Sequence, residues 1–191
     1  MKLLKASLLL AAANISIHAQ GQSMTDLGTL GGNSSYAHAA SADGSVVVGQ
    51  AYNASNEWRA FRWTGGVMTN LGTLGGNYSY AKAVSADGAV VVGEAQNGSN
   101  VYRAFRWTDG IMSDLGTLGG NSSYAQAVSA DGAVVVGQAH NASNENRAFR
   151  WTGGVMTNLG TLGGNVSYAY GVSADGAVVV GLSQNLSLIH I

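Results

Sequence analysis

The hexapeptide RAFRWT occupies residues 59–64 and recurs at residues 103–108 and 147–152, each time 44 residues further along the chain. Six of the nine Lys and Arg residues of the chain lie in these three copies. A nucleic-acid patch, a catalytic cluster and a structural seam between repeats would each explain such a concentration of positive charge. These explanations require different neighbouring residues, so the surrounding sequence discriminates among them.

The same 44-residue step governs nearly the whole chain. A second motif, SADG, contains an acidic residue that recurs at Asp43, Asp87, Asp131 and Asp175. A third motif, LGTLGGN, follows a methionine and two polar residues, and this methionine recurs at Met24, Met68, Met112 and Met156. Self-similarity at a fixed period of this size is the signature of a repeat architecture. We therefore assign residues 24–185 to one repeat domain with copies starting near these methionines.

Each unit contains four short segments with β character, which in the first unit are residues 35–42, 45–51, 59–64 and 67–72. The second segment, SVVVGQA, holds a continuous β-branched run, which indicates a strand buried on both faces. We expect tight hairpin turns at Asp43-Gly44 and Gly65-Gly66, because such dipeptides tolerate the positive φ angles that these turns require. Residues 73–77 are expected to carry the chain into the next unit.

Four antiparallel strands in roughly 40–45 residues are typical of a propeller blade. The first strand of each unit has the smallest side chains, such as Ala37, Ala39 and Ala40, and these would fit around a crowded central axis. The sequence therefore predicts an all-β fold of tandem four-stranded antiparallel units, most simply an incomplete, open β-propeller. A stacked-sheet or β-solenoid array is the alternative.

The arginines of RAFRWT fit a structural seam. Alternate residues of a strand share a face, so Arg59, Phe61 and Trp63 point one way and the other three residues point the opposite way. A buried charge must be paired or hydrogen-bonded, and guanidinium suits carboxylates or several carbonyls. The Asp of SADG is the acidic residue present in every unit, so we expect it or nearby carbonyls to hold these side chains. The arginines expected to be buried are Arg62, Arg106 and Arg150.

The charge balance argues against a nucleic-acid partner. The chain has a formal net charge of −1, and no Lys accompanies the RAFRWT motif. Nucleic-acid proteins instead carry a basic patch or stripe. Stacking of a carbohydrate on Trp58, Trp63 or Tyr102 remains an alternative use of the aromatic residues.

Nothing in the sequence predicts a catalytic, metal or cofactor site. His38 and His140 stand at unrelated repeat positions, so no histidine recurs, and cysteine is absent. Ser41 and Asp43 resemble a catalytic pair, but a hairpin turn explains them more simply. The Asn- and Asp-rich loops lack the D-x-D-x-D-G spacing of calcium loops. We assign no catalytic residue, no metal ligand and no cofactor, and the ligand-binding residues are not assigned.

The sequences at the two ends of the chain do not follow the repeat pattern. Residues 1–19 have a positive start, an apolar run and a small residue at a cleavage point, as in a secretory signal peptide. That segment predicts export to the bacterial envelope or beyond, and it is too short to span a bilayer. Residues 186–191, LSLIHI, break the period and match the translation of CTG-TCT-CTT-ATA-CAC-ATC, a transposase end used in library preparation. We interpret them as an adapter-derived artefact and expect the natural protein to continue.

The order of RAFRW, SADG followed by VVVG, and a Met followed by LGTLGG resembles the bacterial extracellular repeats of the HAF family. The family takes its name from a His-Ala-Phe triplet, which is Arg59-Ala60-Phe61 here, so the histidine is replaced. The resemblance covers residues 24 to about 185. It implies a secreted repeat protein and a fragment of a larger surface or autotransporter-type protein, since some members of the family carry a C-terminal autotransporter barrel or another anchor. It supplies no catalytic residues.

These observations predict an exported, non-enzymatic repeat module that serves as a binding or adhesion scaffold for a protein or glycan ligand. Repeat folds often carry variable insertions on one binding face. The alternative is a fragment of a propeller-type glycan-cleaving enzyme whose catalytic residues lie in missing blades. The variable segments expected to contact a ligand are Tyr52–Trp58, Gln96–Tyr102 and His140–Asn146.

Overall fold

The computed structural model describes residues 24–185, and within them all regular structure is β. The first sheet contains β1 (Gly31–Ala40), β2 (Val46–Asn53), β3 (Trp58–Thr64) and β4 (Val67–Asn70). The second contains β5 (Gly75–Val84), β6 (Val91–Asn97), β7 (Tyr102–Thr108) and β8 (Ile111–Asp114). The third contains β9 (Gly119–Val128), β10 (Val134–Asn141), β11 (Asn146–Thr152) and β12 (Val155–Asn158). The fourth contains β13 (Gly163–Val172) and β14 (Val179–Asn185).

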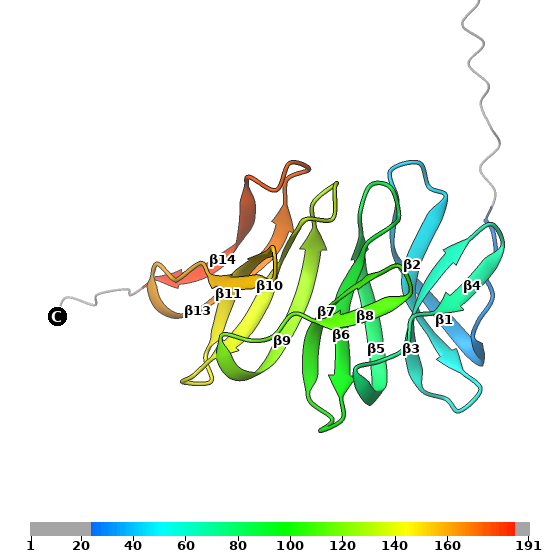
Figure 1. The fold of residues 1–191 in the computed structure, drawn as a ribbon, viewed down its shortest axis with the longest axis horizontal. Coiled ribbons are helices and arrows are strands. Elements are labelled where there is room, and N and C mark those ends of the chain that lie inside the picture. The colour runs from blue at the N-terminus through cyan, green and yellow to red at the C-terminus, as the bar shows by residue number, and fades with distance from the viewer. Residues whose placement is uncertain (1–23, 186–191) are drawn as a thin grey trace, which may run out of the picture.

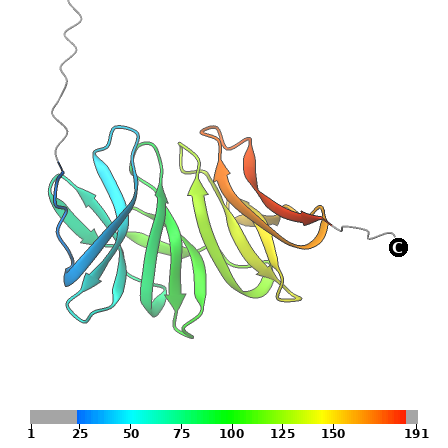
Figure 2. The ribbon, with the colours of Figure 1, turned by 180° about the vertical axis from the view of Figure 1, so that it is seen from behind.

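Each of the first three sheets is a meander in which consecutive strands pair antiparallel. The sheets stand side by side as an open fan, with the outer strands β4, β8 and β12 on one side (Figure 1). The first strands of neighbouring sheets contact one another on the opposite side, which Figure 2 turns toward the viewer. The prediction of tandem four-stranded antiparallel units in an all-β, open arrangement is confirmed.

The signal-peptide interpretation of residues 1–19 and the artefact interpretation of residues 186–191 both lie outside the described residues. They therefore stay predictions. Met68, Met112 and Met156 lie inside the outer strands β4, β8 and β12, so a copy counted from its methionine begins in the last strand of one sheet and continues into the next sheet.

The two hairpin turns of a unit differ from each other. Gly65 and Gly66 have φ angles of 57° and 87°, as the predicted two-residue turn requires. At the SADG turn Gly44 alone has a positive φ, of 72°, and the amide of Ser41 donates to the carbonyl of Val46. The predicted hairpin turn at Asp43-Gly44 is therefore present, but it is a longer loop closed around Ser41 and not a two-residue turn with two positive φ angles.

The boundary between units also differs from the prediction. The Gly75-Gly76-Asn77 segment, expected to be a connection, forms the start of β5, which runs for 10 residues. Leu71 and Leu74 on the preceding connection are buried or half-buried against the hydrophobic core of the first seam. The connection therefore contributes to packing and does not merely link the sheets.

The hydrophobic core lies in the seams between neighbouring sheets. Phe105 of β7 is fully buried and packs in one cluster with Val46, Val48 and Ala60 of the first sheet. Trp107 is partly buried against the same cluster. The aromatic residues of RAFRWT therefore supply the apolar area between units, as the sequence predicts. In the second seam the corresponding phenylalanine is Phe149.

A hydrogen bond from the second arginine of each RAFRWT copy crosses a seam. The Nε of Arg62 donates to the carbonyl of Gly88, in the SADG turn of the next sheet, at 2.9 Å. The Nε of Arg106 donates in the same way to the carbonyl of Gly132 at 3.2 Å, and the Nη2 of Arg150 donates to the carbonyl of Gly176 at 3.5 Å. The predicted bonding to a carbonyl of the adjacent unit is confirmed, although these arginines are half-buried.

The Asp of SADG does not pair with these arginines. The carboxylate of Asp43 accepts hydrogen bonds from the hydroxyls of Ser41 and Ser45 and from the amide of Ser45 within its own turn. These bonds lower the pKa of Asp43 to about 2. Ser41 also accepts from the amide of Val46, so the serine-aspartate pair stabilises the turn, as the hairpin interpretation requires.

Candidate functional site

The variable hairpin loops between the second and third strands all emerge at one end of the fan. Residues 54–57, 98–101 and 142–145 lie at this end, which we call the loop end, and the SADG turns lie at the other (Figure 1). The predicted variable segments are therefore gathered on one side of the molecule. The rest of each unit forms the scaffold that positions them.

An asparagine at the end of the second strand orders each loop. The side-chain carbonyl of Asn53 accepts hydrogen bonds from the amides of Ser55 and Glu57, each at 2.9 Å. Asn56 then adopts the left-handed conformation with a φ of 56°. The same bonds form at the counterparts Asn97 and Asn141. The Asn-x-Ser triplets at these three positions therefore have a structural role in holding the loops in one conformation.

An ion pair follows the loop in the first and third units. Arg59 contacts Glu57 at 2.7 Å and Arg147 contacts Glu145 at 2.6 Å, and both arginines are largely buried. The amide hydrogen bond from Asn141 is the main cause that lowers the pKa of Glu145, and Arg147 adds to it. Both arginines also donate to a backbone carbonyl of the next sheet, those of Asn77 and Asn165.

The second unit lacks this ion pair. Val101 stands where the other units have glutamate, and the Nε of Arg103 is buried with no hydrogen-bond partner among residues 24–185. The loop end therefore differs from unit to unit in charge as well as in side-chain shape.

Polar pairs join the first and second strands of each complete sheet. In the first sheet His38 and Gln50 contact each other at 3.1 Å. In the second, Lys82 and Glu94 form an ion pair at 3.3 Å. In the third, Gln126 donates to Gln138 at 3.4 Å. Equivalent positions thus carry a different pair in each sheet, and we call these six residues the polar row.

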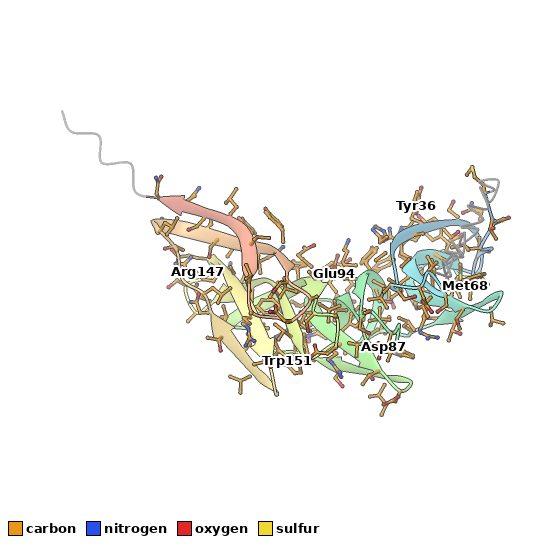
Figure 3. All side chains as sticks on the ribbon, turned by 90° about the horizontal axis from the view of Figure 1, so that it is seen from above. Tyr36, Met68, Asp87, Glu94, Arg147 and Trp151 are labelled. Carbon is orange, nitrogen blue, oxygen red and sulfur yellow. The ribbon has the colours of Figure 1, made fainter. Side chains whose placement is uncertain are left out.

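In the second pair, Lys82–Glu94, the carboxylate is buried and its pKa is shifted. Burial is the main cause that raises the pKa of Glu94, and the charge of Lys82 opposes it. The Oε2 atom of Glu94 is buried and has no hydrogen-bond partner among the described residues. Burial is also the main cause that lowers the pKa of His38, and the charge of Lys82 lowers it further. Figure 3 shows Glu94 between Tyr36 and Arg147 along the fan.

Aromatic side chains adjoin these pairs. In the first sheet Trp58 stacks on Tyr52 with ring centroids 3.7 Å apart, and Tyr36 lies 5.5 Å from Trp58. Tyr36 is 56% exposed. In the second sheet the rings of Tyr80, Tyr102 and Tyr124 follow one another across the seam to the third sheet, with centroids 6.0 and 6.2 Å apart. We call these two groups the first and second aromatic clusters.

The second aromatic cluster lies beside the Lys82–Glu94 pair of the polar row. Burial is the main cause that raises the pKa of Tyr80, and a hydrogen bond with Tyr102 adds to it. Lys82 lies over the Tyr80 ring, 5.7 Å from its centroid. A face that combines planar rings with amide, carboxylate and ammonium groups has the chemistry to bind polar ligands with apolar faces.

The residues considered for catalysis lie apart from one another. His38 is on β1, His140 is on β10 at the loop end, and Ser41 and Asp43 form their turn at the opposite end. Within residues 24–185 no group of three or more His, Cys, Asp or Glu residues is placed to hold a metal ion. In the same residues no helix long and apolar enough to cross a membrane occurs.

Sequence reasoning missed the polar row because the two residues of each pair lie 12 positions apart in the sequence. The much stronger 44-residue repeat drew attention to the residues that recur and not to those that vary. Their signal was present as paired variation: His38 with Gln50, Lys82 with Glu94, and Gln126 with Gln138. Only antiparallel pairing of the first two strands brings these side chains together.

Comparison with known proteins bears on the fold. No protein-family description matches the chain, and no curated protein matches its sequence. The structure is similar to TolB from Acinetobacter baumannii, with 12% identity and a TM-score of 0.58 over 81% of this chain and 39% of that one. It is also similar to a protein described as TolB from Agrobacterium tumefaciens, with 17% identity and a TM-score of 0.56 over 80% of this chain and 60% of that one.

TolB is a β-propeller protein, so the tandem sheets form an open arc of propeller blades. The propeller prediction is confirmed in preference to a β-solenoid. The chain spans less than two thirds of the length of either TolB chain.

Proposed function

We propose that this protein is an exported, non-enzymatic repeat module that binds a protein or glycan ligand at the bacterial cell surface or in the extracellular space. The HAF-type repeat order and the segment 1–19 support export. The function rests on one observation in particular. Differences between units gather at the loop end and along the polar row, while the seam residues repeat.

The chemistry of this surface supports a binding role. The loops at 54–57, 98–101 and 142–145 are held in shape by asparagine side chains, so a ligand would meet a largely preformed surface. Pre-organisation of this kind reduces the entropy that binding must overcome. The aromatic clusters supply flat apolar area, and the polar row supplies hydrogen-bonding groups that differ from sheet to sheet.

The rival proposal, a propeller-type glycan-cleaving enzyme, needs two carboxylates or a carboxylate with a histidine placed around one bond. Among residues 24–185, Glu94 is the buried acidic residue with a raised pKa, and its ion-pair partner is Lys82. We therefore favour binding for this part of the chain.

The test is a binding screen of the purified full chain on a glycan and host-matrix array, run beside a panel of hydrolase substrates. We expect array signals without turnover. The double variant Trp58→Asn/Tyr102→Asn should lose the signal, because it removes one ring from each aromatic cluster. The third unit already has Asn146 at this position of its strand, so the substitution is compatible with the fold.

The matched control is Ala89→Ser, which lies in the exposed SADG turn at the opposite end and copies Ser45 of the first unit. This variant should bind like the parent chain. Turnover that disappears when one acidic residue is changed would overturn the proposal. Unchanged array signals in the double variant would remove the aromatic clusters from the binding surface.

A further inference from the structure

A cleft opens in the second seam, at the end of the fan that carries the SADG turns. It lies between the second and third sheets and has a volume of about 590 Å³. Arg106 of β7 forms one wall. The other walls are the SADG turn of the third sheet at Gly132 and the end of β11, from Trp151 to the following turn at Gly153. Both sheets have four strands, so the cleft belongs to a complete seam in the middle of the repeat domain.

Arg106 is the charged residue that lines this cleft. Its Nε donates to the carbonyl of Gly132 at 3.2 Å, which holds the guanidinium against the third sheet. Within residues 24–185 its two Nη groups make no hydrogen bond, and Arg106 belongs to no ion pair. The Nη groups are therefore available to a ligand. A guanidinium binds a carboxylate well, because its planar fork can donate two parallel hydrogen bonds to the two oxygens.

Trp151 supplies a flat apolar wall. Its side chain is half-buried and packs against the hydrophobic core of the second seam. Thr152 is the lining residue with a side-chain hydroxyl. An aromatic ring can stack on an indole, whereas a sugar brings several hydroxyls that each need a hydrogen-bond partner when they are buried. Walls with one guanidinium, one hydroxyl and one indole therefore suit a flat aromatic acid better than a sugar.

The acidic residue next to the cleft is bonded within its own turn. Asp131 precedes Gly132, and its carboxylate accepts hydrogen bonds from the hydroxyl of Ser129 at 2.6 Å and from the amide of Ala133 at 3.0 Å. Asp131 does not line the cleft. A ligand at these walls therefore meets the positive charge of Arg106 and no lining carboxylate.

The first seam repeats the residues of this cleft with one change. Its arginine, SADG glycine and tryptophan are Arg62, Gly88 and Trp107. At the position of Gly153, however, it has Asp109. The two residues have φ angles of 57° and 51°, so the turn keeps its backbone conformation while it gains a negative charge. A like charge placed beside the binding site of an anion opposes its binding.

We propose that the cleft of the second seam binds a planar aromatic carboxylate, and that Asp109 prevents the first seam from binding the same ligand. The carboxylate accepts hydrogen bonds from the Nη groups of Arg106, and the ring lies against Trp151. The ligand therefore contacts the second and third sheets at once. This inference concerns the end of the fan opposite the loop end and does not depend on the proposed function.

The experiment titrates benzoate into the isotope-labelled full chain and follows amide and indole signals by NMR. We expect saturable shifts at the amides of Gly132 and Gly153 and at the indole of Trp151. Benzamide has the same ring without the charge and should bind at least about tenfold more weakly, because it lacks the charged hydrogen bonds to Arg106. Acetate and glucuronate should also bind more weakly than benzoate, since neither has a planar ring to stack.

Two variants exchange the residue that distinguishes the seams. Gly153→Asp should weaken benzoate binding in the second seam by about tenfold or more, because it places a carboxylate beside Arg106. Asp109→Gly should add a second set of shifts, at Gly88 and Trp107 in the first seam.

The matched control is Gly65→Asp. Gly65 has the same φ of 57° as Gly153, and a Cβ at either glycine would meet nothing within 4 Å. It lies on the first sheet, away from the second seam, so this variant should bind benzoate like the parent chain. Circular dichroism checks that all variants keep their β structure. The loop-end double variant Trp58→Asn/Tyr102→Asn should also keep the benzoate shifts, which separates this site from the proposed function.

Equal affinity for benzoate and benzamide would overturn the proposal, as would undiminished binding of benzoate by Gly153→Asp. Glucuronate that binds as tightly as benzoate would contradict the choice of an aromatic ligand. If Asp109→Gly adds no shifts in the first seam, the role given to Asp109 is wrong.

Discussion

In the first and third RAFRWT copies the two arginines act at different ends of a seam. Arg62 reaches the SADG turn of the next sheet, and Arg59 reaches Asn77 at the start of the next first strand. Both contacts end on backbone carbonyls, which every sequence provides. A guanidinium can therefore join two units without requiring a matched acidic residue in the second unit. This explains why six of nine basic residues lie in one repeated motif of a charge-poor chain.

The first prediction concerns Arg106, in the second seam. Arg106→Ala removes one charged hydrogen bond to the carbonyl of Gly132, so we expect the free energy of unfolding to fall by about 1.5–3 kcal/mol. The loss is smaller than that for an orphaned buried carboxylate, because Asp131 is satisfied within its own turn. Chemical denaturation monitored by tryptophan fluorescence measures the change. A loss below half a kcal/mol would show that solvent replaces the bond.

The second prediction concerns the aspartates of the SADG turns. Hydrogen bonds from serine hydroxyls and turn amides lower the pKa of Asp43 to about 2 and lower the pKa values of its three counterparts, Asp87, Asp131 and Asp175. A carboxyl whose pKa is lower in the folded state stabilises the fold above its unfolded pKa. That contribution is lost as pH falls through the folded pKa. We therefore expect stability to decrease as pH falls from about 4 toward 2.

The measurement is the midpoint of urea denaturation across this pH range. The double variant Asp87→Asn/Asp131→Asn should show a shallower decrease, because two of the titrating groups are gone. An unchanged slope in that variant would assign the acid sensitivity to other carboxyl groups.

At the scale of the element, the hairpin loop after each second strand keeps one backbone conformation while its side chains differ from unit to unit. Asn53, Asn97 and Asn141 form the same backbone bonds, so the loop conformation persists while its other residues change. The residue four positions later is Glu57, Val101 or Glu145, according to the unit. An element of this kind can vary its chemistry with little effect on its shape.

The third prediction uses this natural variation. Val101→Glu should create in the second unit the ion pair that Arg59 and Arg147 already have, and should supply a partner for Arg103. We expect a gain of about 0.2–1 kcal/mol in the free energy of unfolding, which should decrease at high salt. Thermal and urea denaturation at low and high salt measure it. The reciprocal change, Glu145→Val, should lose a similar amount, and a gain from both changes would contradict the ion-pair explanation.

Much of the fold is predictable from the sequence because residues close together in the chain determine its strands and turns. The Gly65-Gly66 turn, the buried VVV run and the alternating faces of RAFRWT all depend on near neighbours. The hydrogen-bond partner of each arginine was less predictable. The carboxylate of Asp43 accepts a hydrogen bond from Ser41 in its own turn, so it does not need an arginine from another unit. The polar row was missed because only strand pairing joins its members.

At the scale of the whole molecule, the SADG turns link neighbouring sheets into one row. The amide of Ala42 donates to the carbonyl of Ala86, and the amide of Ala86 donates to the carbonyl of Ala130. Each sheet otherwise contacts mainly its immediate neighbours, which is the condition for approximately additive, nearest-neighbour stability in a repeat protein. Coupling between sheets should therefore be measurable one seam at a time.

The last prediction isolates the steric part of that coupling with two glycines. Gly44 and Gly132 occupy the same position of the SADG turn, with φ angles of 72° and 71°. A Cβ at Gly132 would lie 2.5 Å from Cγ2 of Val90 in the preceding sheet, whereas a Cβ at Gly44 would meet nothing within 4 Å. Gly44→Ala should cost about 1–2 kcal/mol from backbone strain alone.

Gly132→Ala should cost the same strain and a further 1–3 kcal/mol or so, because Val90 must move within a packed seam. Urea denaturation of the two single variants gives the difference. Because the backbone strain is matched, the excess in Gly132→Ala reports the contact between the second and third sheets. Equal losses would mean that Val90 relaxes freely, and the sheets would then be coupled mainly through Arg106 and the chain of backbone hydrogen bonds.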